Sequence, residues 1–360
     1  MITATESRRN AHPERPPRRG VARRGSCLVL VAAIGVSMGG CGLFTRNSPT
    51  VRGPRVEPRT PAVIVLEHGA GPRRPLRFDL PVGTETEVEL RVDLHLTQHG
   101  DDPTGTTRPS DRDQPAGRAV VIDPPATYQQ VRFTVTGADS SGHDVEFEVV
   151  DAGVELEGTI LTDVQAVELT AEVQQLVGVR GELRLDRRGA VRSVTFAPLP
   201  TTALTDDPDA RARTEAQLRE VEQQLTSVVP QLPSEPVARG ARWRTAGRSA
   251  LAGTALRQTT TYEITAIDGD VIIYRATISQ SAGEQALETA TNGPTAAGDD
   301  TRLLAAELTG TTNGRVSLVS LASEHETRLV GSQLIDVDGD PPARVRQELD
   351  LVVSAGPPPS

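Results

Sequence analysis

One cysteine stands in a setting that favours covalent modification of its thiol. Cys41 follows Met38, Gly39 and Gly40, and a lipoprotein signal peptidase needs small residues directly before a cysteine that already carries diacylglycerol. The third position before that cysteine is usually leucine, which Met38 resembles in size and polarity. We therefore predict that Cys41 is lipidated and that the chain is cleaved just before it.

The cysteine count supports this prediction. Cys27 lies within residues 1–40 and would be lost on cleavage, so Cys41 would be the sole cysteine of the mature chain. An unpaired thiol in an exported protein is open to oxidation unless something occupies it. The alternative is an ordinary secreted protein that is cleaved elsewhere and keeps Cys41 as a spare thiol.

Residues 1–40 have the composition of a signal peptide. Seven arginines between residues 8 and 24 precede an uncharged apolar run over residues 27–38. A helix that crosses a bilayer needs roughly twenty apolar residues, so this run is too short to span one. The arginine pairs leave open whether export follows the general secretory route or the twin-arginine route.

Other patterns that could do chemistry fail on physical grounds. Residues 35–39 match a nucleophile elbow, which needs a strand-to-helix turn in a folded sheet, but they lie in the predicted signal peptide. His95 and His99 are four residues apart. On the strand predicted there they would lie about 13 Å apart, too far to share one metal ion.

The remaining candidates are equally weak. His68, His143 and His325 lie in scattered segments. Residues 336–340 have the oxygen density of a calcium loop but lack the later bidentate glutamate, so we interpret them as a polar turn. We therefore predict no catalytic residue, no metal site and no cofactor, and we expect that the chain is not an enzyme.

Charge restricts the partners that the surface can attract. All 38 basic residues are arginine, which excludes Schiff-base and other lysine chemistry. Without residues 1–40 the chain has 31 basic and 46 acidic side chains, a net charge of −15. A surface this acidic repels nucleic-acid phosphates and anionic lipid head groups, so we expect no nucleic-acid partner.

Residues 41–61 are predicted to form a disordered tether after the signal peptide. Their four prolines are separated by polar residues, and such a segment cannot bury enough apolar surface to become ordered. Its reach would be about 25 Å as a coil or about 60 Å in the polyproline II conformation.

From residue 62 onward, alternation with period two predicts β-strands that are buried on one face. In residues 87–96 the apolar side chains fill the even positions and charged ones the odd positions. Turn residues predict hairpins at Asp139–Gly142, Asp186–Gly189 and Asp268–Gly269. The similar order of parts predicts two similar antiparallel-sheet halves, residues 62–200 and 236–356, related by an internal duplication.

An amphipathic linker helix is predicted between the halves, within residues 201–235. It opens at Asp206-Asp207-Pro208 and ends at Pro230. Acidic residues and proline are favourable in the first turn of a helix, and proline is common where a helix ends. Its apolar positions between residues 218 and 228 follow 3, 4 and 3 spacing, which predicts packing against a sheet. A second, weaker helix is predicted over residues 164–176, and the fold class is mainly β (α+β).

Two motifs resemble a known family. Residues 232–243 carry a leucine-proline, proline-valine, glycine and tryptophan series that resembles the signature of an uncharacterised family of bacterial envelope lipoproteins. Residues 183–191, a strand followed by Asp, Gly and a second strand, are similar to an element that this family carries before its linker. The resemblance covers residues 75–355 and implies export and two similar β-rich halves, but no mechanism, because the family has no established activity.

The sequence thus predicts an exported lipoprotein of the cell envelope, held outside the cytoplasm on a membrane by its lipid anchor. We expect a non-enzymatic binding module whose partner is an envelope protein or an apolar ligand. A structural or protein-interaction lipoprotein without a ligand pocket, a lipid carrier and an unrecognised hydrolase are the alternatives. We also expect Trp243, the only tryptophan, to be a buried core residue at the start of the second half.

Overall fold

The computed structural model describes residues 55–56, 61–101, 119–157, 161–197, 218, 221–251, 254–286, 301–337 and 343–359. Every described residue belongs to one compact unit of the chain, Ala33–Ser360. The predicted signal peptide, Cys41 and the start of the linker helix therefore lie outside the described residues.

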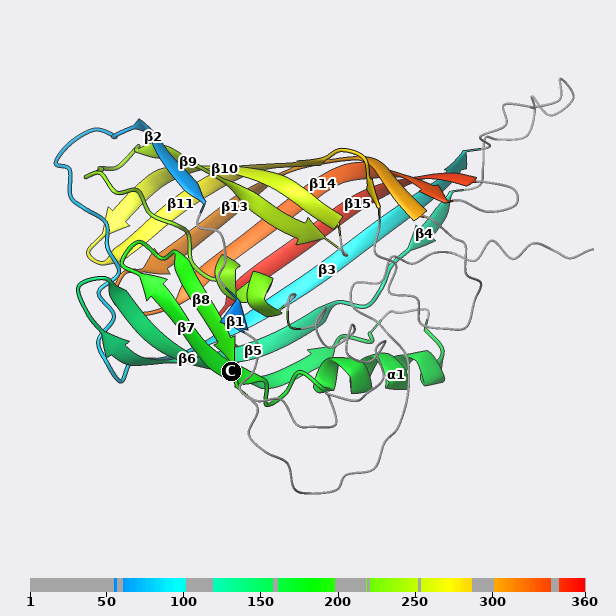
Figure 1. Cartoon of the computed structure of the whole chain (residues 1–360), viewed down its shortest axis with the longest axis horizontal. Helices are drawn as coiled ribbons and strands as arrows, with labels where there is room; N and C mark the ends of the chain where they lie inside the picture. Colours follow the sequence, from blue (N-terminus) through cyan, green and yellow to red (C-terminus); the bar gives the residue numbers. More distant parts are fainter. Residues whose placement is uncertain are drawn as a thin grey trace, which may run out of the picture. The chain divides into compact units, whose positions relative to one another are not determined.

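The described residues form one antiparallel sheet (Figure 1). Its strand order is β1-β8-β7-β6-β5-β3-β15-β14-β13-β11-β10-β9-β2, with β4 beside β3 and β12 beside β13. The fold is mainly β, as the period-two patterns predict. The strands are β1 Arg55–Val56, β2 Ala62–Glu67, β3 Glu85–Asp101, β4 Val120–Ile122, β5 Thr127–Ala138, β6 Gly142–Val154, β7 Arg180–Asp186, β8 Val191–Phe196, β9 Arg242–Leu251, β10 Thr254–Asp268, β11 Val271–Ala282, β12 Gln285–Ala286, β13 Thr301–Ser317, β14 Ser323–Val337 and β15 Ala343–Gly356.

Local sequence signals account for these elements. In β3, Val88 and Leu90 are buried and the charged side chain of Glu87 is exposed, as the alternation predicts. The three predicted turns join β5 to β6, β7 to β8 and β10 to β11. Helix α1, Asp163–Gln174, confirms the weaker predicted helix, and a capping box of Thr162 and Gln165 marks its start.

The sheet is continuous across the boundary between the predicted halves. β3, from the first half, pairs with β15, from the second, between Glu89 and Asp101. β2, also assigned to the first half, pairs with β9 of the second. The structure therefore shows one sheet rather than two, and the division into two similar halves remains a prediction.

Part of the predicted tether is ordered. Arg55 and Val56 form β1, which pairs with β8 through Thr195 and Val194. An edge strand such as β8 presents unpaired N–H and C=O groups that attract further backbone. The prediction of disorder is therefore wrong for these two residues, while residues 41–54 lie outside the described ones.

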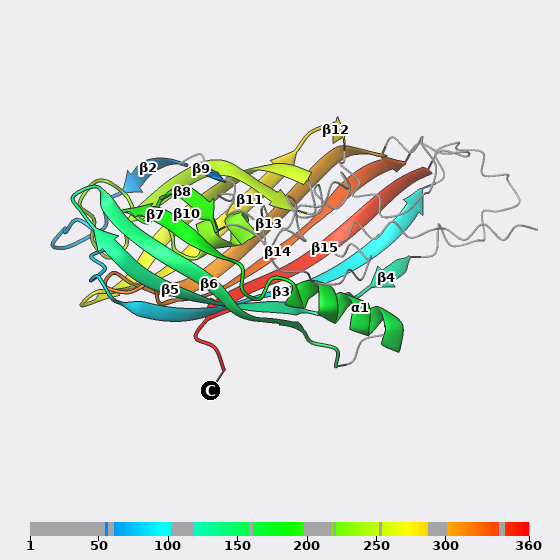
Figure 2. The same cartoon turned by 60° about the horizontal axis from the view of Figure 1, so that its bottom comes forward.

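The sheet is strongly curved (Figure 2). Strands β1 and β2 lie at opposite ends of the strand order, but only residues 57–61 separate them along the chain. Such a link spans about 21 Å at most. In a flat sheet thirteen strands wide the two edges would lie about 58 Å apart. The sheet must therefore curl until its two edges come close to each other.

A helical segment fills the concave face at one end of the sheet. Residues 221–227 are helical, and the apolar stripe predicted between residues 218 and 228 is buried in the main hydrophobic cluster. The apolar space left between this segment, Phe133 and Leu183 is about 10 Å³. A single water needs about this much room, so an acyl chain does not fit there.

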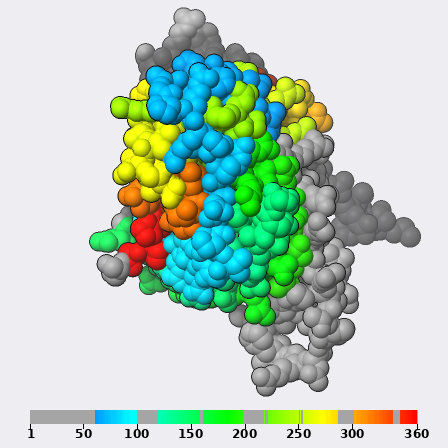
Figure 3. Space-filling view, turned by 90° about the vertical axis from the view of Figure 1, so that its left-hand side faces the viewer, coloured from blue at the N-terminus to red at the C-terminus, as the bar shows by residue number. Residues whose placement is uncertain are grey.

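An extended segment, residues 76–80, covers the same end. Leu76, Phe78 and Leu80 are buried in the core. The Phe78 N–H donates to the Arg187 carbonyl oxygen at 2.8 Å, and the Asp79 N–H donates to the Leu318 carbonyl oxygen at 2.8 Å. Figure 3 shows this part of the chain, in blue, lying between the green strands and the yellow and orange strands.

Trp243 is buried, as predicted, with 1% of its surface exposed. Its ring stacks on Tyr262 with 5.1 Å between centroids, and its Nε1–H donates to the Gln231 carbonyl oxygen at 2.9 Å. The tryptophan therefore fixes the segment that follows the helical residues against β9.

Three other aromatic rings lie directly opposite glycines on neighbouring strands. A Cβ added to any of these glycines would come within 2.9 Å of the facing ring. The rings therefore cover bare backbone, which compensates for the packing that a strand glycine loses. The pairs are Phe147 with Gly181, Tyr128 with Gly153, and Tyr274 with Gly314.

Replacing Gly189 with alanine should destabilise the protein more than the same change at Gly240. Both glycines have a left-handed φ, +84° and +81°. A Cβ at Gly189 would lie 2.7 Å from the Phe78 ring and 3.0 Å from the Pro230 carbonyl oxygen, whereas nothing lies within 4 Å at Gly240.

In urea unfolding we expect Gly240→Ala to lower the free energy of unfolding by about 1 to 2 kcal/mol, the usual cost of the left-handed conformation. Gly189→Ala should lower it by about 3 to 4 kcal/mol, because crowding adds to that cost. Equal losses for the two variants would contradict the tight packing of the β7–β8 turn on Phe78.

Candidate functional site

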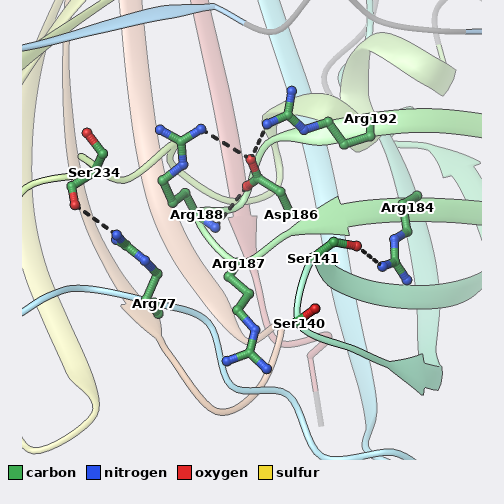
Figure 4. A pocket seen from close by; sticks show the side chains of 9 residues that line it. All are labelled: Arg77, Ser140, Ser141, Arg184, Asp186, Arg187, Arg188, Arg192 and Ser234. Carbon is green, nitrogen blue, oxygen red and sulfur yellow. Dashed lines mark hydrogen bonds and ion pairs between the residues drawn. The ribbon is translucent and has the colours of Figure 1, made fainter.

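Five arginine side chains line one pocket of about 500 Å³ (Figure 4). They come from two distant parts of the chain, the segment 76–80 and the β7–β8 hairpin. Serine hydroxyls and a single carboxylate, that of Asp186, complete the lining. We call this site the arginine pocket, and its arginines are Arg77, Arg184, Arg187, Arg188 and Arg192.

Strand periodicity gathers four of these arginines on one hairpin. Leu183, Leu185 and Val191 are buried, so the alternation of a strand directs Arg184 and Arg192 away from the core. Arg187 and Arg188 occupy the turn itself. The same alternation that builds the core therefore concentrates positive charge on the opposite side of the hairpin.

The carboxylate of Asp186 organises this turn. Its Oδ1 accepts hydrogen bonds from the backbone N–H groups of Arg188 at 2.8 Å and Ala190 at 2.9 Å. Its Oδ2 accepts from Nη2 of Arg192 at 2.6 Å and lies 3.5 Å from Nη2 of Arg188. One largely buried carboxylate thus fixes the turn backbone and two guanidinium groups.

The turn also brings Arg77 and Ser234 to the pocket. The Arg188 carbonyl oxygen accepts from the Leu232 N–H at 2.8 Å, which holds the segment before Ser234 against the turn. Among the described residues, the side chain of Arg77 donates only to backbone carbonyl oxygens, through Nη1 to Leu76 at 2.6 Å and Pro233 at 3.0 Å, and through Nη2 to Ser234 at 2.8 Å.

Two further carboxylates, those of Asp139 and Asp144, form ion pairs with Arg184. Its guanidinium group lies 2.5 Å from Asp139 and 2.8 Å from Asp144, and it also donates to the Ser141 hydroxyl at 2.6 Å. Hydrogen bonds from Ser141, followed by that from Arg184, lower the pKa of Asp139. Within the described part of the chain, the side chain of Arg187 donates only to the Asp139 carbonyl oxygen, at 3.2 and 3.3 Å.

Like charges are therefore held close together in this pocket. Partial burial, and next the nearby guanidinium group of Arg188, lower the pKa of Arg77, whereas the carboxylate of Asp186 acts in the opposite direction. Within the described part of the chain, no carboxylate lies within 4.0 Å of Arg77 or Arg187. Guanidinium groups that are partly buried and lack a carboxylate partner favour an anionic ligand.

The histidines considered from the sequence do not come together. Each lies beside a different polar group: His95 is 2.9 Å from Asp123, His99 is 3.9 Å from Glu348, His68 is 2.5 Å from Glu235, and His143 is 3.1 Å from the Phe78 carbonyl oxygen. The hydrogen bond that the carboxylate of Asp123 accepts from His95 raises the pKa of this histidine. Among the described residues, no three metal-ligating side chains gather around a common point.

His325 lies on β14 and faces the interior. Burial lowers the pKa of its imidazole to about 4. The Ser323 hydroxyl, 3.4 Å from Nδ1, is its nearest polar partner. Residues 338–340 of the predicted polar turn, like Cys41, lie outside the described residues.

Sequence reasoning missed the arginine pocket. A signal was present, because four arginines occur within the nine residues from Arg184 to Arg192, but we interpreted that stretch only as a hairpin. The net charge of the whole chain is negative, so it gives no indication of a local cluster of positive charge. Arg77 and Ser234 reach the pocket through backbone contacts that no local pattern indicates.

Comparison with known proteins leaves the chain without an assigned relative. No family model matches it, and no curated protein is significantly similar to it. In the described residues, every helix is too short or too polar to cross a bilayer.

The free energy of unfolding should fall as the pH drops from 6.5 to 4, in part because of His325. The unfolded chain takes up a proton at this histidine near pH 6.5, whereas the folded protein does so only near pH 4. More protons are bound in the unfolded state across this window, so acid favours unfolding, by about 3 kcal/mol for this group.

The test compares the free energy of unfolding of the unaltered protein with that of a His325→Gln variant. Carboxylates also add a pH dependence, but it is the same in both proteins and cancels in the comparison. Urea unfolding at pH 7, 5.5 and 4 should show a smaller loss of stability for the variant. Parallel losses in both proteins would show that the histidine does not stay neutral on folding.

Proposed function

We propose that this chain is an exported lipoprotein of the bacterial cell envelope, anchored through Cys41, whose folded part binds anionic groups in the arginine pocket. The observation that carries the binding function is the imbalance of charge in that pocket. Five guanidinium groups meet there, and two of them, those of Arg77 and Arg187, have no carboxylate within 4.0 Å among the described residues.

The lining supports binding rather than covalent chemistry. It offers guanidinium groups and serine hydroxyls, and none of its side chains is a histidine or a cysteine that could activate a hydroxyl or act as a nucleophile. An apolar ligand finds less support, because the apolar space beside the helical segment is only about 10 Å³. The pocket of about 500 Å³ has the size of a small-molecule site.

The sequence supports the anchor. Cys41 follows small residues and a short apolar run, and it precedes the first described strand residue, Arg55, by fourteen residues. That length spans about 48 Å when extended, which leaves room between a lipid in the membrane and the folded sheet. The arginine pocket would then be presented to ligands outside the cytoplasm.

Cys41→Ser should abolish membrane attachment, because no other cysteine remains after cleavage to carry the lipid. In detergent phase partitioning we expect the variant in the aqueous phase or as an unprocessed precursor. Cys27→Ser is the matched control, since that cysteine lies in the apolar run, and it should partition like the unaltered protein. Detergent-phase partitioning of a Cys41→Ser protein that has been cleaved to its mature size would refute the anchor.

Arg187→Gln should weaken anion binding at least tenfold, because a hydrogen bond to a charged group contributes about 1.5 to 3 kcal/mol. Arg187 has no carboxylate partner among the described residues, so this change strands no buried charge. Calorimetric titration with inorganic phosphate at low salt measures the affinity.

Two variants control this experiment. Arg187→Lys keeps the charge and should retain part of the affinity. Arg275→Gln removes an equal charge from an exposed ion pair with Glu263 on β10 and β11, and it should bind phosphate like the unaltered protein. If Arg275→Gln weakens binding as much as Arg187→Gln, the pocket is not the binding site.

A further inference from the structure

We propose that the arginine pocket selects compact dianions, and that its ligand carries a phosphate monoester rather than a carboxylate or a phosphate diester. This inference rests on the proposed function, because it specifies the ligand of the same pocket.

Two of the five guanidinium groups in the pocket, those of Arg77 and Arg187, have no carboxylate within 4.0 Å among the described residues, whereas Arg184, Arg188 and Arg192 each have at least one. A ligand with two negative charges balances these two guanidinium charges, whereas a single carboxylate or a phosphate diester leaves one of them without a counterion.

Among the described residues, the side chains of Arg77 and Arg187 donate only to backbone carbonyl oxygens, and a neutral carbonyl does not cancel a full charge. The nearby guanidinium group of Arg188 further disfavours the charge of Arg77. A phosphate monoester places two charges and three acceptor oxygens in one tetrahedral group, whereas a dicarboxylate spreads its charges apart.

The size of the pocket and the charge of the whole chain also restrict the ligand. The volume of about 500 Å³ lies within the range of small-molecule sites, so the pocket has room for more than a bare oxyanion. The serines at its rim, Ser140 and Ser234, offer hydroxyls to the organic part of a ligand. The mature chain, with a net charge of −15, repels long polyanions. A small ester with one phosphate group satisfies all three conditions.

The test compares methyl phosphate with dimethyl phosphate and acetate by calorimetric titration of the mature protein at pH 7.5. Methyl phosphate is a dianion there, and the other two are monoanions. We expect methyl phosphate to bind at least tenfold more tightly. Succinate, a dianion with separated charges, should bind more weakly than methyl phosphate, and equal binding would overturn the requirement for a compact dianion.

Lowering the pH from 7.5 to 5 gives a second readout. The second pKa of a phosphate monoester is about 6, so methyl phosphate loses one charge, while the arginines keep theirs. Affinity for methyl phosphate should fall towards that for dimethyl phosphate, while affinity for sulfate, a dianion at both pH values, should fall much less. Circular dichroism at pH 5 checks that the protein stays folded.

The titrations distinguish a failure of dianion selection from a failure of anion binding itself. Equal affinities for methyl phosphate and dimethyl phosphate would overturn the selection of dianions and leave anion binding intact. Failure of every anion to bind, or binding that Arg187→Gln leaves unchanged, would overturn both.

The same chemistry could come from a soluble ester or from a lipid head group. Glycerol 3-phosphate in solution tests the first source. Phosphatidylcholine vesicles with and without phosphatidic acid test the second, with the Cys41→Ser protein so that the anchor does not interfere. Binding to either probe, weakened by Arg187→Gln, supports the inference and identifies the source, whereas binding to neither overturns it.

Discussion

The carboxylate of Asp186 is the contact on which the architecture of the pocket depends. It is a largely buried acid that accepts hydrogen bonds from two backbone N–H groups of its own turn and from two arginines. The turn that it holds then binds two other segments through its carbonyl oxygens, at Phe78 and at Leu232. Removing one partner from such a network leaves the others without compensation, so the core contact at Phe78 and the position of Arg77 depend on the same acid.

This arrangement shows why net charge is a poor guide to local recognition. Residues 41–360 are strongly acidic, and many of their acids form exposed pairs with arginines on the outer face of the sheet, such as Arg275 with Glu263 and Arg328 with Asp350. Exposed pairs of this kind contribute little to stability. In the arginine pocket, by contrast, Arg77 and Arg187 have no carboxylate partner among the described residues, and a low surrounding dielectric strengthens their field.

Much of the fold could be predicted from the sequence because its signals are local. Period-two alternation gave the strands, Asp and Gly residues gave the hairpins, and 3, 4 and 3 spacing gave the buried stripe of residues 218–228. Each of these signals depends on neighbours within a few residues. Burial of Trp243 followed in the same way, because its neighbours suit a chain that begins a strand.

The rest could not be predicted, because it depends on contacts between distant residues. Nothing in β3 specifies that its partner is β15, and nothing in β2 specifies β9, since exposed strand edges are alike in chemistry. The segment 76–80 also owes its place to backbone hydrogen bonds with Arg187 and Leu318. The pocket depends on both local signals and distant contacts. The arginines of its hairpin are close together in the sequence, but no local pattern predicts that Arg77 lies beside them.

The pairing of β3 with β15 has a consequence for the order in which the protein folds. The two strands lie about as far apart in the sequence as the folded part allows, and bringing distant segments together carries an entropic cost that slows folding. Until β15 has been synthesised, one edge of a seventeen-residue strand has no partner along most of its length. During that interval β3 is a template for aggregation, and β15, which follows all the other described strands in the sequence, is the one that covers it.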